Sequence, residues 1–176
     1  MEWLLPFVGP ALVLGALVLS WMAGRLDRLH HRVEKASAVL DAALFHRSGT
    51  VVEIASAKIL DPAASLLLLD AAHRARASTD EEREPAESDL SRALLAALAD
   101  ADQVRRLRAD PSHGVLIEEL SDACRTVELS RRFHNDVAAA ARELHGRVLV
   151  RWFRLSGHAA PPRMVELDDS WPPALS

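Results

Sequence analysis

Small and apolar residues recur at steps of four and three positions through the last third of the chain. This spacing returns to one side of an α-helix, which turns about every 3.6 residues. The positions are Leu116, Leu120, Ala123, Val127, Ser130, His134, Val137, Ala141, Leu144 and Val148. A helix with a single apolar stripe must bury it against other helices, so the pattern predicts a helical bundle.

The first half of the chain also follows a helical period. Apolar residues continue at helical spacing from Leu26 to Leu44, and the stretch "RSGT" at 47–50 is expected to end that helix. A second helix is predicted over residues 50–77. It is interrupted at Asp61 and Pro62, which suit a helix cap followed by a first-turn proline.

An acidic stretch separates this half from the next helices. Residues 78–89 carry six acids and one arginine, which predicts a solvated loop. A third helix is expected from Leu90 to Val104, and a turn at 108–114 leads into the fourth. We therefore expect an all-α chain, an antiparallel four-helix bundle whose first and last helices are long.

The N-terminal stretch from Trp3 to Ala23 contains no charged residue and is long enough for a transmembrane helix. A cleaved signal peptide is the alternative, but Glu2 precedes the stretch and Trp21 stands near its end. The expected organisation is a transmembrane anchor at 1–24 that continues into the first bundle helix, a helical bundle at 25–156 and an irregular tail at 157–176.

The charges that follow this stretch predict its orientation. Arg25, Arg28, Arg32 and Lys35 come directly after it, so the positive-inside rule predicts a single-pass protein of the cytoplasmic membrane with its C-terminal domain in the cytoplasm. The single cysteine, Cys124, fits a reducing compartment.

Three small residues suggest self-association. Ala16, Ser20 and Gly24 are four positions apart and would let two helices approach closely, which suggests a homo-oligomer.

A polar motif, "RRFHND", lies on the fourth helix. We interpret Arg131, Arg132, His134 and Asn135 as residues that fasten the helix to its neighbours, with His134 inside the stripe, and we expect Asp27 to be the acid that pairs with the arginines.

This pairing follows from a simple alignment of the two long helices. If the first ends near Arg47 and the last starts near Ser112, Val127 lies level with Val33.

Beyond the motif, apolar and basic residues alternate. Arg147, Arg151 and Arg154 surround Trp152 and Phe153, which is typical of a segment that lies on an anionic membrane surface. Packing of the same residues on the bundle is the alternative.

The stretches "LDAALFHR" (40–47) and "VELSRRFHNDV" (127–137) resemble motifs of the LemA family, in the same order along the chain. The first matches at Asp41, Leu44 and Arg47. The chain differs from the family pattern at Cys124 and His134, among other positions. The resemblance implies an N-terminal span, a cytoplasmic helical bundle and a structural or scaffolding role without established chemistry.

No sequence motif for catalysis, a metal or a cofactor is found. With a net charge of -4, the chain also gives no indication of nucleic-acid binding. We therefore expect a scaffold or interaction protein that is not an enzyme, needs no cofactor and binds unknown protein partners. The alternative is a factor that binds anionic membrane lipid through residues 147–155.

Overall fold

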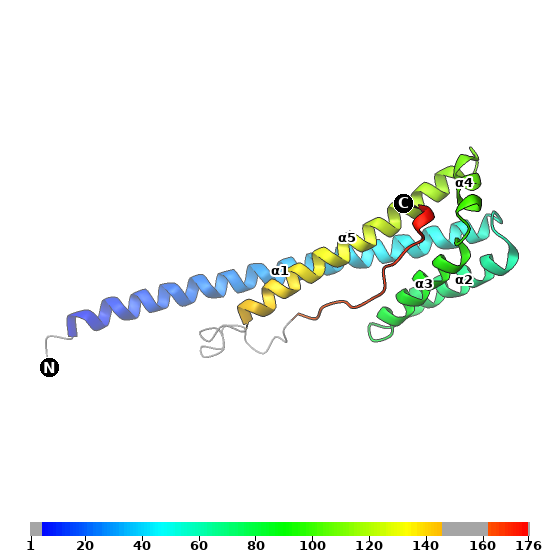
Figure 1. Ribbon diagram of the computed structural model, residues 1–176. Coiled ribbons are helices and arrows are strands. Elements are labelled where there is room, and N and C mark those ends of the chain that lie inside the picture. The colour runs from blue at the N-terminus through cyan, green and yellow to red at the C-terminus, as the bar shows by residue number, and fades with distance from the viewer. Residues whose placement is uncertain (1–4, 146–161, 176) are drawn as a thin grey trace. The chain divides into compact units, whose positions relative to one another are not determined.

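The computed structural model describes residues 5–145 and 162–175 and is an all-α, bundle-like structure (Figure 1). These residues form five α-helices and a short 3-10 turn, and no strand lies within them. The helices are α1 (Leu5–Ser56), α2 (Pro62–Ala77), α3 (Arg83–Ala97), α4 (Ala101–Ala109) and α5 (Gly114–His145), and the 3-10 turn is Pro173–Leu175.

The chain divides into two compact units. The first comprises residues 1–37 and 134–164, and the second comprises residues 38–133 and 165–176. The bounds that the sequence suggested for the bundle, 25–156, and for the tail, 157–176, stay predictions.

The transmembrane helix predicted at 3–23 is wrong. A membrane-spanning helix needs about 20 predominantly apolar residues. In the described part of the chain, no helix has a stretch that is both long and apolar enough to cross a membrane. Along α1, the described apolar side chains up to Trp21 are followed by the charged residues Arg25, Asp27 and Arg28.

Helix α1 also does not end at "RSGT" as predicted, but continues to Ser56. Two hydroxyl groups in that stretch bond back to the helix instead of breaking it. Ser48 Oγ donates to the carbonyl of Phe45 at 2.9 Å, and Thr50 Oγ1 donates to the carbonyl of His46 at 3.2 Å. Because both hydroxyls are satisfied by preceding turns, the helix continues through them.

The longer α1 changes which residues face each other in the second unit. Val127 of α5 packs with Leu40 and Leu44, about two to three turns from the predicted level of Val33. Earlier residues of α5, such as Leu120, share a core with Ile54. Residues later in α1 therefore pack with residues earlier in α5, so these two stretches run antiparallel.

The break between α1 and α2 occurs where the sequence predicted it. Asp61 caps α2, because its Oδ1 accepts the backbone N–H groups of Ala63 and Ala64, each at 3.0 Å, and Pro62 opens the helix. The chain leaves α1 through Lys58, whose φ of 58° ends the helical conformation.

The acidic stretch and the third helix both differ from their predictions. Residues 83–89 belong to α3 and are not loop, and Glu87 within them is buried. The predicted third helix is two helices, because the chain breaks after Ala97 and Asp100 caps α4 by accepting the N–H of Asp102 at 2.9 Å.

The turn between α4 and α5 depends on a glycine. A Cβ at Gly114 would lie 2.5 Å from the carbonyl oxygen of Arg108, closer than side-chain carbons approach backbone. Only glycine fits where α5 begins against the end of α4.

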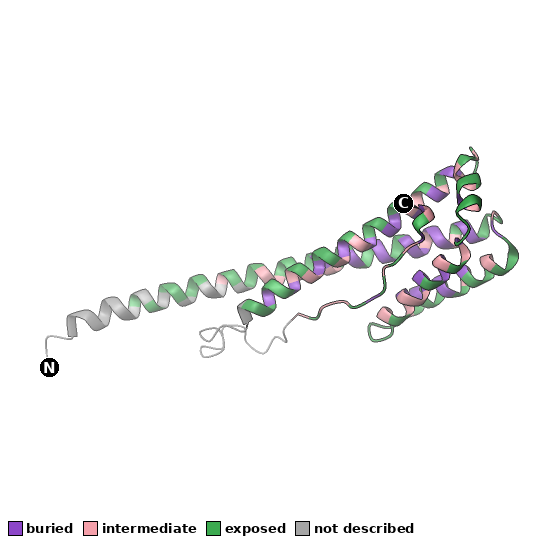
Figure 2. Ribbon diagram, viewed as in Figure 1, coloured by how far each residue is buried: buried purple, intermediate pink, exposed green. Residues whose placement is uncertain are grey.

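The buried apolar side chains of the second unit form a main core and a smaller cluster around Val127. Helices α2 and α3 contribute to the main core as a side-by-side pair (Figures 1 and 2). Along α5 the buried positions follow the predicted stripe, with Ile117, Cys124 and Ala138 added, while Leu116 and Val137 are half-buried. The burial of Leu144 and Val148, the last two positions of the predicted stripe, lies outside what the structure describes. The main core consists of Val51, Ile54, Ala55, Leu60, Leu68, Ala71, Ala72, Ala75, Leu90, Ala93, Leu94, Leu98, Val104, Ile117, Leu120, Cys124 and Leu175.

Candidate functional site

The first arginine of the polar motif pairs with an acid that the sequence did not suggest. Arg131 forms a two-pronged ion pair with Asp169: its Nε lies 2.7 Å from Oδ2, and its Nη2 lies 3.1 Å from Oδ1. Both side chains are largely buried, at 22% and 16% exposed. The expected partner, Asp27, lies 4.0 Å from His31 on its own helix. The proposed pairing with Asp27 is therefore corrected to Asp169.

The second arginine makes the local pair that its spacing suggested. Arg132 Nη2 lies 2.5 Å from Glu128 Oε1, one turn earlier on α5. Asn135 is half-buried on the same helix. Arg131 and Arg132 thus bind acids in different parts of the chain and do not converge on one point.

His134 lies in the buried stripe of α5, where it is 4% exposed. Its Nε2 lies 3.2 Å from the backbone carbonyl of Arg163. A carbonyl only accepts, so Nε2 carries the proton and donates. The ring is used as a hydrogen-bonding core residue.

The apolar anchors of the C-terminal segment, defined here as residues 165–175, lie against the bundle. Leu167 is buried with Val127, and Leu175 is buried in the main core. Between them, Trp171 packs on the main core, and its Nε1 donates to Glu128 Oε2 at 3.3 Å. The tail was expected to be irregular, and between Pro162 and Pro172 it has no regular element, yet it is firmly packed.

The backbone of the C-terminal segment is held by polar side chains of three helices. Ser121 Oγ donates to the carbonyl of Leu175 at 2.7 Å, and Arg108 Nη2 donates to the same oxygen at 3.0 Å. On α3, Ser88 Oγ accepts the N–H of Asp168 at 3.0 Å. The residues that hold the segment therefore come from α3, α4 and α5.

Asp168 also organises the segment locally. Its Oδ1 accepts the N–H of Ser170 at 2.9 Å. Hydrogen bonds from the side chain and backbone of Ser170 hold the pKa of Asp168 below its ordinary value.

Sequence reasoning missed this packing. The available signal was the spacing of Leu167, Trp171 and Leu175, which places a large apolar residue at every fourth position of a proline-rich tail.

A buried ion pair lies within the second unit. Arg47 is fully buried, and its Nη2 lies 2.7 Å from Glu87 Oε2. The same guanidinium donates to Ser91 Oγ at 3.0 Å and to the backbone carbonyl of Glu87 at 3.3 Å. This arrangement joins α1 to α3 and leaves both charges away from solvent.

Cys124 is buried in the main core. Burial raises the pKa of its thiol to about 11, against a smaller opposing effect from Arg47. The thiol therefore stays protonated at neutral pH and is a poor nucleophile.

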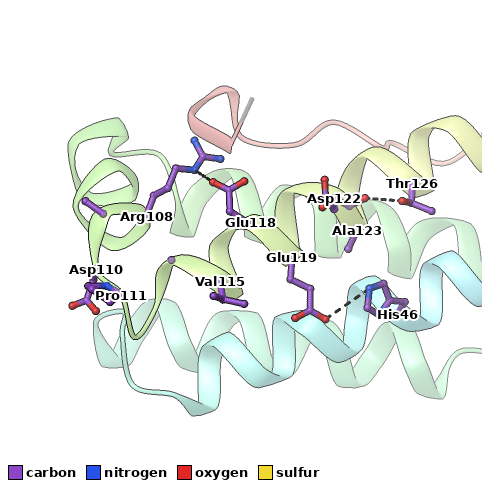
Figure 3. A pocket seen from close by; sticks show the side chains of 12 residues that line it. His46, Arg108, Asp110, Pro111, Val115, Glu118, Glu119, Asp122, Ala123 and Thr126 are labelled. Carbon is purple, nitrogen blue, oxygen red and sulfur yellow. Dashed lines mark hydrogen bonds and ion pairs between the residues drawn. The ribbon is translucent and has the colours of Figure 1, made fainter.

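A shallow hollow of about 650 Å³ lies between the end of α4, the start of α5 and His46 of α1 (Figure 3). Its acids point toward neighbouring polar groups. Glu118 lies 2.6 Å from Arg108 Nε, and Glu119 lies 3.9 Å from His46 Nε2. Within the described residues, no group of three or more histidines, cysteines and acids is placed to hold a metal ion.

The predicted membrane-interface residues, Arg147, Arg151, Trp152, Phe153 and Arg154, lie outside the described residues. Their role stays a prediction.

Comparison with protein-family models, with curated proteins and with solved structures gives no match to this chain.

Proposed function

We propose that this chain is a LemA-like helical interaction protein that performs no catalysis and binds extended segments of polypeptide against its bundle. The observation that carries the proposal is the binding of its own C-terminal segment. Arg131 and Glu128, within and just before the polar motif, contact that segment directly.

The contacts to the C-terminal segment have the composition of a protein–protein interface. Trp171 and the ion pair of Arg131 are of the residue types that dominate binding energies at interfaces. Ser121 and Arg108 recognise backbone carbonyl oxygen, which every polypeptide offers. A binding site of this kind therefore suits a segment of another protein that carries apolar residues four positions apart and an acid between them.

The geometry of the motif favours binding over reaction chemistry. A catalytic arrangement would need its polar groups to face one reacting atom. Arg131, Arg132 and His134 instead engage an acid of the tail, an acid of their own helix and a backbone carbonyl.

The experiment is a competition between the tethered segment and a free one. A fluorescent peptide with the sequence of residues 162–176 is titrated into the full chain and into a full-chain Trp171→Ala, Leu175→Ala variant. A tethered segment acts at an effective concentration on the order of millimolar, so the wild type should bind the peptide poorly. Weakening the tethered segment should tighten peptide binding at least about tenfold.

Two controls make the result specific. A Leu66→Ala, Leu67→Ala variant changes exposed apolar residues of α2 and should bind the peptide as weakly as the wild type. A peptide with Asp169→Ala should bind the first variant less well than the unchanged peptide. If a well-folded Trp171→Ala, Leu175→Ala variant does not bind the peptide at all, the proposal is wrong.

A further inference from the structure

One face of α1 changes from apolar to basic along its length. Described residues on this face recur at steps of four and three, which keeps them within an arc of roughly 120° of the helix. They are Val13, Leu17, Trp21, Arg25, Arg28, Arg32 and Lys35. The apolar residues precede Trp21, and the basic residues follow it.

The apolar part of this face is open to solvent. Val13 is 61% exposed, Leu17 is 62% exposed and Trp21 is 61% exposed. Single exposed apolar side chains are ordinary on protein surfaces, but a consecutive row on one helix face is typical of an interaction surface.

The basic part borders a hollow. Trp21, Arg25, Arg28 and Arg32 line a hollow of about 490 Å³ within the first unit, together with Leu29 and two residues of α5, Ala140 and Glu143. Among the described lining residues, three guanidinium groups therefore face this hollow against the single carboxylate of Glu143. The guanidinium of Arg25 lies 5.8 Å from the centre of the Trp21 ring, within the range of a cation–π contact.

The acids of this part of α1 lie elsewhere around the helix. Asp27 and Glu34 are centred more than 100° from the middle of the basic face. Both approach His31, at 4.0 Å and 3.1 Å. The basic face is therefore not neutralised by its own helix neighbours.

We propose that this face of α1 binds the surface of an anionic lipid bilayer, with Arg25, Arg28 and Arg32 on the phosphate groups and Trp21 at the level of the headgroups. The order of the residues favours lipid over other anions. A bilayer surface offers phosphate beside hydrocarbon, and the face offers guanidinium groups beside Trp21 and Leu17. A nucleic acid or a free phosphate would leave that apolar row in water. The proposal does not depend on the C-terminal segment, so it can fail while the proposed function stands.

The test is sedimentation of the full chain with vesicles of phosphatidylglycerol or of phosphatidylcholine. The wild type should bind phosphatidylglycerol at low salt and lose most of that binding at high salt, because surface charges are screened. An Arg25→Gln, Arg28→Gln, Arg32→Gln variant should bind about a hundredfold more weakly, since each arginine near an anionic surface contributes about a factor of five.

The matched control is an Arg105→Gln, Arg106→Gln, Arg125→Gln variant. It removes the same charge from exposed positions of the second unit and should bind nearly as well as the wild type. Equal losses in the two triple variants, or no loss in the first, would overturn the proposal.

Two further measurements separate lipid from other anions. Trp21→Ala should weaken vesicle binding by itself, because the apolar contact is lost. Inorganic phosphate at millimolar concentration should not displace the protein from vesicles; displacement would mean that the hollow is an ordinary anion site and that the lipid proposal is wrong. Circular dichroism checks that each variant keeps its helical content.

Discussion

The buried pair of Arg47 and Glu87 gives the sharpest prediction of stability. Glu87→Leu removes the carboxylate and leaves the guanidinium charged in a place where neither side chain is more than 4% exposed. An uncompensated buried charge costs about 3–5 kcal/mol of unfolding free energy. That is a large part of the roughly 5–15 kcal/mol that stabilises an ordinary domain.

Replacing both partners should recover much of that loss. In an Arg47→Met, Glu87→Leu variant, no charge is left buried, and apolar side chains of similar size occupy the same space. Ser91 Oγ loses its donor, which costs about 1 kcal/mol. We therefore expect the double variant to be more stable than Glu87→Leu alone.

The assay is urea denaturation followed by circular dichroism, with thermal melting as a second measurement. Glu87→Leu should lower the melting temperature by roughly 6–20 °C for a chain of this size. Asp41→Asn serves as the control, because its ion pair with Arg83 is at the surface and should contribute less than about 1 kcal/mol. A loss below about 1 kcal/mol for Glu87→Leu, or a double variant as unstable as the sum of the two single variants, would refute the reasoning.

Three further predictions follow from single contacts. In a double-mutant cycle, Arg131→Ala and Asp169→Ala should couple by about 1–2 kcal/mol, and strictly additive losses would contradict their ion pair. Because burial raises the pKa of the Cys124 thiol to about 11, a disulfide reagent at pH 8 should label this thiol no faster than the chain unfolds in urea. Rapid labelling of the folded protein would be contrary evidence. Folding lowers the pKa of Asp168, so the ionised carboxylate should stabilise the fold fully above about pH 4 and lose that effect as the pH falls further. The difference in urea midpoint between the wild type and Asp168→Asn should shrink over the same pH range. A difference independent of pH would argue against the contact.

Local signals in the sequence predicted local structure well. The helical period identified the all-α class and most of the buried stripe of α5. The cap at Asp61 and the proline after it correctly placed the start of α2. These features depend on residues within a few positions of each other, which is what a sequence shows directly.

The errors arose where distant residues decide the outcome. A serine and a threonine in "RSGT" looked like a helix end, but their hydroxyls bond back into α1. Because α1 was predicted to end too early, its alignment with α5 was wrong by two turns or more. The acid predicted to pair with Arg131 was wrong for the same reason. Glu87 looked like part of a solvated acidic loop because its partner, Arg47, is 40 positions away.

The candidate site was predicted only in part. The sequence drew attention to Arg131 and His134 and suggested that they fasten the structure together. It did not suggest that Arg131 would fasten a C-terminal segment, since Asp169 stands in an irregular tail. The spacing of Leu167, Trp171 and Leu175 was the one signal, and it does not show which surface of the bundle an extended segment packs against.

The central claim is that the bundle holds the C-terminal segment as an extended ligand, and hydrogen exchange measures this most directly in the full chain. The N–H of Asp168 donates to Ser88, that of Ser170 to Asp168 and that of Leu175 to Pro172. These amides should exchange at least about tenfold more slowly than in an unstructured peptide, and Arg131→Ala should remove much of that protection. Exchange of residues 165–175 at the rate of an unstructured chain in the wild type would contradict the claim.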